Sequence, residues 1–173
     1  MTATAGLLVQ DEEELDRLAI ALRQGGPRFA IVVCAEALRA FAEERLRART
    51  PSLVWSDRTD LNTPESTLEQ LTRISSESND APIANLAVSD ASVIHTLNWH
   101  REKLHRGAPV LLWMDGAIQH TFRTLAPDAW SFRATVAWVY GRPEPPYDHA
   151  RVLEGRYRRL FAGRRASVVS VYQ

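Results

Sequence analysis

The 173-residue chain has one cysteine, one lysine and no net charge. The single cysteine, Cys34, excludes an intramolecular disulfide and a cysteine-based metal cluster, and it is typical of a reducing compartment. Lys103 is the only lysine, a bias that we assign to genome composition rather than to a binding site. The 21 basic and 21 acidic residues cancel, so no long-range field attracts nucleic acid or an anionic membrane.

Long apolar runs are also missing. No segment approaches the roughly 18 apolar residues that a membrane-spanning helix needs. The N-terminal stretch MTATAGLLVQDEEEL has no basic region and reaches acidic residues too early for a signal peptide. We therefore expect a soluble, cytoplasmic protein without a membrane partner. Its hydrophobic content of 45% and charged content of 24% are typical of a globular domain with a sizeable core.

Apolar runs alternate with amphipathic segments along the chain. The helical periodicity predicts helices over residues 11–24, 35–49, 64–76, 91–106 and 117–125. The apolar runs predict strands over residues 29–34, 53–55, 83–88, 109–114 and 134–140, with residues 126–132 as a turn. Strands that are apolar on both faces and alternate with helices form parallel sheets. We predict an α/β three-layer sandwich with a mainly parallel five-stranded sheet, P-loop-like or flavodoxin-like.

Composition also suggests how the chain is divided. Residues 1–10 are small and weakly polar, and we expect a flexible tail there. Residues 11–140 form the α/β domain. Residues 141–173 begin with the proline-rich break GRPEPPYD and continue with a basic helix and an apolar end. That end is either an edge strand of the same sheet or the start of a further domain.

The chain has no glycine between Gly26 and Gly107, which excludes a phosphate loop after the first strand. A Walker A loop needs glycines, a lysine and a serine or threonine, and a dinucleotide site needs glycines at the same place. The sequence there is CAEAL. The fourth strand, VLLWMD, nevertheless ends in Asp115 like a Walker B strand. Asp115 either organises magnesium in a degenerate nucleotide-binding domain or caps the following helix.

Cys34 is the other weak candidate for chemistry, because it ends a strand just before a helix N-terminus. The alternative is a small buried apolar residue. A hydrolase built on this thiol would need a pocket at the strand ends, lined with Cys34 by Asp57, Ser89 and Asp115.

The histidines do not form a metal motif. His95, His100 and His105 are five residues apart on one predicted helix, whereas a helical zinc pair needs a spacing of three or four. His120 stands in no motif either. We therefore predict no metal site and no cofactor.

Two segments carry unusual side chains, residues 98–115 and 125–139. Asp128, Trp130 and Arg133 crowd into the second, and Arg101 lies in the arginine-rich helix of the first. Tryptophan and arginine dominate the hot spots of protein interfaces, so these four residues are candidate interaction anchors.

The alternative for the second segment is structural. Asp128 would cap a turn, Trp130 and Phe132 would close the core, and Arg133 would pair with an acidic residue.

Together these two segments resemble an N-terminal α/β domain of large bacterial conflict and defence proteins, associated with STAND-type NTPases and tetratricopeptide repeats. The resemblance covers mainly residues 91–139. Its residues are Leu97, Asn98, Arg101, Leu104, Pro109, Leu111, Leu112, Trp113, Ala126, Pro127, Asp128, Trp130, Ser131 and Arg133. It implies a non-catalytic sensor or adaptor domain that acts on a downstream module.

We therefore expect a protein-interaction domain of a bacterial signalling or anti-phage defence system. Its partner would be another protein, a downstream domain of the same system or a second copy of the chain, and not a nucleic acid. The alternatives are a degenerate P-loop-type nucleotide-binding domain and a small hydrolase that uses Cys34.

Overall fold

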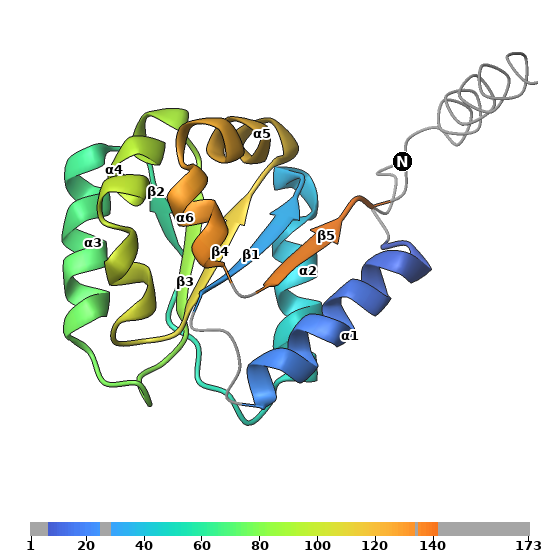
Figure 1. The fold of residues 1–173 in the computed structure, drawn as a ribbon. Coiled ribbons are helices and arrows are strands. Elements are labelled where there is room, and N and C mark those ends of the chain that lie inside the picture. The colour runs from blue at the N-terminus through green and yellow to red at the C-terminus, as the bar shows by residue number, and fades with distance from the viewer. Residues whose placement is uncertain (1–6, 25–28, 134, 142–173) are drawn as a thin grey trace, which may run out of the picture. The chain divides into compact units, whose positions relative to one another are not determined.

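The computed structural model describes residues 7–24, 29–133 and 135–141 (Figure 1). The chain divides into two compact units, Met1–Gly141 and Arg142–Gln173. The tail expected over the first residues and the helix and strand expected after residue 141 lie outside the described residues, except that helix α1 already begins at Val9.

Helices and strands alternate along the first unit. The helices are α1 (Val9–Arg23), α2 (Glu36–Arg49), α3 (Pro64–Ser76), α4 (Ile94–Trp99), α5 (Gly116–Leu125) and α6 (Pro127–Phe132). The strands are β1 (Phe29–Cys34), β2 (Thr59–Leu61), β3 (Ala84–Val88), β4 (Val110–Met114) and β5 (Thr135–Val139). Short 3₁₀ segments, Ala91–Val93 and Arg101–His105, flank α4.

All five strands are parallel, in the order β2-β3-β4-β1-β5. Helices α3 to α6 cover one face of the sheet, and α1 and α2 cover the other (Figure 1). The expected α/β three-layer sandwich with a parallel sheet is therefore confirmed. A flavodoxin-like sheet has the order 2-1-3-4-5, whereas here β1 lies between β4 and β5.

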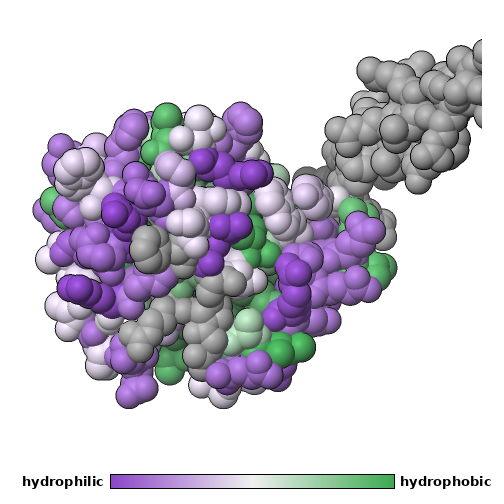
Figure 2. All heavy atoms as spheres, in the orientation of Figure 1, coloured by the Kyte–Doolittle hydropathy of each residue, from purple (hydrophilic) through white to green (hydrophobic). Residues whose placement is uncertain are grey.

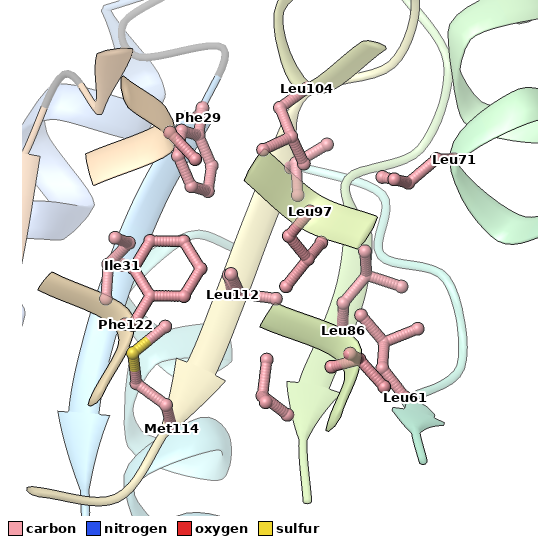
Figure 3. Packing of buried hydrophobic residues seen from close by; sticks show 14 of the residues in the cluster. Phe29, Ile31, Leu61, Leu71, Leu86, Leu97, Leu104, Leu112, Met114 and Phe122 are labelled. Carbon is pink, nitrogen blue, oxygen red and sulfur yellow. The ribbon is translucent and has the colours of Figure 1, made fainter. Parts of the chain in front are cut away.

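The core consists of two layers, one on each face of the sheet. Every residue of β1 and of β4 is buried, and successive residues belong to opposite layers, as the pleat of a strand requires. Figure 3 shows part of the layer under α3 to α6, which contains Phe29, Ile31, Leu112 and Phe122. The other layer contains a buried polar contact, in which Trp113 Nε1 donates to Asn85 Oδ1 at 2.8 Å.

The predicted strand at residues 53–55 is wrong. Only Trp55 pairs there, through an isolated bridge to Ile83, and β2 lies at Thr59–Leu61 instead. Trp55 is held differently: its indole N–H donates to Thr50 Oγ1 at 3.3 Å. The sequence TDL could not predict β2, because Leu61 is the only buried residue of this three-residue edge strand.

Two further segments differ from the prediction. The helix expected over 91–106 is interrupted at His100, where the backbone leaves the α region (φ −110°, ψ 28°) and continues as a 3₁₀ turn. The turn expected over 126–132 is the short helix α6, with Pro127 in its first turn. In the structure, α4 and α6 pack against each other. The predicted long helix and turn did not suggest this contact.

The outer edge of β5 is occupied by side chains of α1. Among the described strands β5 pairs with β1 alone, so its other edge would present free backbone groups, which invite pairing with another strand. Three residues of α1, spaced three apart, bind these groups. The hydrogen bonds are Arg17 Nη2 to Val136 O (2.9 Å), Trp138 N to Glu14 Oε2 (3.3 Å) and Tyr140 N to Asp11 Oδ1 (2.8 Å). Helix α1 thus covers one face of the sheet and also closes its edge.

Among the described residues, no helix combines the length and the hydrophobicity that a membrane crossing requires.

Candidate functional site

The carboxyl ends of the strands bring together only some of the residues considered for chemistry. Cys34 ends β1 and Asp115 follows β4, and the register that pairs Val33 with Met114 puts these two positions side by side. Ser89 follows β3. Asp57 precedes β2 and therefore lies at the opposite end of the sheet. The four residues do not line one pocket, because β2 begins later than the sequence predicted.

The thiol of Cys34 is unsuited to nucleophilic chemistry. Its side chain is buried, and it donates to the carbonyl oxygen of Ala35 at 3.4 Å. Burial raises the pKa of Cys34 from 9.0 to about 12; the positive charge of Arg39 opposes this effect and the carboxylate of Asp11 adds to it. Because the thiolate is the reactive form, almost none of it exists at neutral pH. Cys34 has the environment of a structural cysteine.

Asp115 has a clear structural role. Its carboxylate accepts a hydrogen bond from the backbone N–H of Ile118 at 2.7 Å and so caps the N-terminus of α5. This is the helix-capping alternative. Helix α2, which follows β1, has Ala35 at its N-cap position and therefore no side-chain cap. Within the described residues, no three histidine, cysteine, aspartate or glutamate side chains are grouped to hold a metal ion.

The two segments singled out in the sequence meet between α4 and α6. Asn98 Oδ1 accepts the backbone N–H of Ala129 at 3.0 Å, and Arg101 Nη1 lies 3.8 Å from Asp128 Oδ2. The cap of α6 therefore comes from Asn98 on α4, and the expected capping by Asp128 is wrong. Asp128 instead forms a half-exposed ion pair with Arg101. Exposed pairs of this kind contribute at most about 1 kcal/mol to folding, so the pair leaves both charges available to a partner.

Trp130 lies between the core and two arginines. Its ring meets Phe122 edge to face, with centroids 6.3 Å apart. The guanidinium carbon of Arg133 lies 3.9 Å from the ring centroid, and that of Arg123 lies at 5.5 Å. Partial burial lowers the pKa of Arg133, and the neighbouring charge of Arg123 lowers it further.

Among the described residues Arg133 pairs with no acidic residue, unlike the expectation: it stacks on Trp130 and also donates to its carbonyl oxygen. The expectation that Phe132 closes the core concerns a side chain outside those that the structure describes. Trp130, in contrast, packs against the core, as the structural alternative proposed.

Trp99 is the residue that the sequence reasoning missed. It ends α4 directly after Asn98, and 78% of its surface is exposed. We define the α4–α6 surface by six residues: Trp99, Arg101, Arg123, Asp128, Trp130 and Arg133. A sequence signal existed, since Trp99 stands inside the NWHREK stretch. Its exposure could not be read there, because tryptophan is more often buried than exposed.

Comparison of the chain with protein-family models, with curated proteins and with solved structures found no match. The function must therefore be argued from the geometry of these sites.

Proposed function

We propose that this chain is a non-catalytic protein-interaction domain, a sensor or adaptor that binds a protein partner through the α4–α6 surface. The observation that carries the proposal is the exposure of Trp99, at 78% of its surface. An exposed tryptophan keeps a large apolar area in water, and burying such an area against a partner is favourable by roughly 25 cal/mol per Å². Tryptophan is also the residue type most enriched in interface hot spots.

The backbone that carries Trp99 is held in place before any partner binds. Leu97 is fully buried in the core, and Asn98 is hydrogen-bonded to α6. Arg101 donates to the carbonyl oxygen of Asn98 at 3.1 Å. A preorganised anchor loses little conformational entropy on binding, which favours affinity.

The charged side chains of the α4–α6 surface suit orientation of a partner rather than catalysis. Arg101 pairs with the carboxylate of Asp128, and the guanidinium groups of Arg123 and Arg133 lie over the ring of Trp130. Arginine recognises carboxylates through two parallel hydrogen bonds. The surface therefore fits a partner that presents an apolar pocket for Trp99 next to acidic side chains.

The resemblance to bacterial conflict and defence proteins supports a partner from the same signalling system. Asn98, Arg101 and Asp128 belong to the resembling motifs, and they contact one another or the same helix in the structure. The partner would be a downstream domain or the product of a neighbouring gene. The balanced charge of the chain argues against nucleic acid as the partner.

Size-exclusion chromatography with light scattering tests the proposal. The chain alone reveals a second copy as partner, and mixtures with the neighbouring gene products reveal the others. We expect Trp99→Ala to weaken the complex by at least about 30-fold, as loss of a hot spot of 2 kcal/mol does. Phe41→Ala is the matched control, because this exposed aromatic residue lies on α2 across the sheet.

Two results would contradict the proposal. One is a monomer that binds none of these proteins, and the other is a complex that Trp99→Ala leaves intact. A rise in melting temperature with ATP or GTP and magnesium would favour the degenerate nucleotide-binding domain instead, because only ligands that bind the native state stabilise it.

A further inference from the structure

A second surface of the molecule lies between α1 and the edge strand β5. A groove of about 340 Å³ opens there, lined by Gln10, Glu13, Glu14, Trp138 and Tyr140. In Figure 2, hydrophobic side chains gather in the strip between α6 and α1, where β5 lies, beside the hydrophilic surface of α1. This groove shares no residue with the α4–α6 surface.

Two aromatic rings form one wall of the groove. Trp138 of β5 and Tyr140, which directly follows the strand, are two residues apart, and their rings stack with centroids 6.1 Å apart and an angle of 13° between the planes. Tyr140 is 67% exposed. Aromatic faces carry negative electrostatic potential and attract cations, most often the planar guanidinium group of arginine.

Two carboxylates of α1 form the facing wall. Glu14 is engaged, since it accepts from Arg17 Nη2 at 2.6 Å and from the backbone N–H of Trp138 at 3.3 Å. Glu13 is exposed and takes part in none of the hydrogen bonds or ion pairs among the described residues. Arg17 cannot serve as the cation of the groove, because its guanidinium already binds Glu14 and the carbonyl oxygen of Val136. Within the described residues, the groove thus offers one carboxylate without an ion-pair partner beside two aromatic rings.

The edge of β5 limits how a partner can bind here. A peptide that added itself as a sixth strand would need the backbone groups of Val136, Trp138 and Tyr140. Side chains of α1 already bind these groups. Recognition at the groove therefore depends on the side chain of the partner and not on strand addition.

We infer that this groove binds an arginine side chain presented by a peptide segment of a partner protein. The guanidinium stacks on the exposed ring of Tyr140, and its N–H groups donate to the carboxylate of Glu13. The inference rests on charge complementarity between an acidic, aromatic groove and a planar cation. It does not depend on the α4–α6 surface, so either proposal stands if the other fails.

The test uses two nine-residue peptides of glycine and serine, one with a central arginine and one with citrulline, its neutral isostere. Binding to the full chain is followed by NMR at the indole N–H signal of Trp138, assigned with Trp138→Phe. We expect the arginine peptide to bind with a dissociation constant of ~1 mM. The citrulline peptide should bind at least about fivefold more weakly, because it lacks the charge.

Variants locate the site. Glu13→Gln and Tyr140→Ala should each weaken binding of the arginine peptide at least about threefold, in line with the loss of one ion pair or one cation–π contact. Glu69→Gln, an equal change of charge at an exposed position on α3, should leave binding unchanged. Trp99→Ala should also bind like the unmodified chain, which separates this groove from the α4–α6 surface.

The inference is overturned if the arginine and citrulline peptides bind equally or if neither binds at millimolar concentration. It is also overturned if the arginine peptide binds but neither Glu13→Gln nor Tyr140→Ala affects it. The amide spectrum of each variant shows whether it is folded. Both altered side chains are exposed, and the backbone N–H of Tyr140 keeps its bond to Asp11, so we expect both variants to fold.

Discussion

Replacement of Asp11 by alanine tests whether α1 holds the edge strand of the sheet. The side chain of Asp11 is fully buried although it is a carboxylate. It accepts three backbone N–H groups, from Leu8 at 2.7 Å, Tyr140 at 2.8 Å and Gly141 at 3.0 Å. These bonds start helix α1 and tie it to the end of β5. Alanine removes both acceptor oxygens and therefore all three hydrogen bonds at once.

The loss of stability in Asp11→Ala depends on how deeply each of the three N–H donors is buried. The bond from Gly141 is buried, so its loss leaves an unsatisfied N–H and costs about 1–3 kcal/mol. The bonds from Leu8 and Tyr140 are partly buried, and water can replace the carboxylate there. Their loss costs about 0.5–1.5 kcal/mol each. We therefore expect Asp11→Ala to lower the free energy of unfolding by about 2–6 kcal/mol, a large part of the 5–15 kcal/mol typical of a domain.

Urea unfolding measures this change, and hydrogen exchange shows where it arises. The amides of Tyr140 and Gly141 should exchange faster in Asp11→Ala. Asp11→Asn keeps one acceptor oxygen, so its free energy of unfolding should lie between those of Asp11→Ala and the unmodified chain. Glu13→Ala is the matched control: the same helix loses the same charge at an exposed position, and stability should change by no more than about 0.5 kcal/mol. Equal unfolding midpoints for Asp11→Ala and Glu13→Ala would refute this account of the edge.

The remaining predictions concern the buried thiol and two glycines. Iodoacetamide at pH 8 should leave Cys34 of the native protein unlabelled, because its pKa is about 12; rapid labelling would revive the hydrolase alternative. The raised pKa also means that ionisation of Cys34 favours the unfolded chain, so its contribution to stability falls as the pH rises from about 9 towards 12. Gly107→Ala should destabilise by more than about 2 kcal/mol, because φ is +77° and a Cβ would lie 2.0 Å from a backbone carbonyl oxygen of α3. Gly116→Ala, with nothing within 4 Å, should be neutral or stabilising by up to about 1 kcal/mol in the same urea experiment.

Much of the fold could be predicted because its signals are local. The run FAIVVC predicted β1 to the residue, and PVLLWM predicted β4 with one residue too many. Thr63 and Pro64 predicted the start of α3, and Thr63 Oγ1 does accept the N–H of Ser66 at 3.2 Å. In each case the signal lies within a few residues, where periodicity and capping chemistry act.

The errors occur where the deciding contact is distant in the sequence. β2 is a three-residue edge strand that is defined by its pairing with β3, because its own hydrophobic pattern is too weak to predict a strand. The helix α6 receives its cap from Asn98, 31 residues earlier. Neither partner is indicated by the residues next to the segment that it holds.

For the candidate sites too, the sequence indicated some features and only the structure showed the others. The missing glycines after β1 excluded a phosphate loop from the sequence alone, because that chemistry needs particular residue types at one place. The α4–α6 surface was suggested in part, since Arg101, Asp128, Trp130 and Arg133 are unusual residues for a turn and a helix end. The exposure of Trp99 and the groove beside Tyr140 were not suggested.

The sequence by itself determined that the chain alternates helices with doubly buried strands, that the sheet is parallel, and that no phosphate loop follows the first strand. These properties depend on residue type and on spacing within a short window. The tertiary structure decided the strand order, the burial of Cys34, the exposure of Trp99 and the closure of the β5 edge by α1. The bond between Asp11 and Tyr140 spans 129 residues, and burial depends on which elements pack over a side chain. Such properties belong to the packed molecule because they arise only when distant segments meet.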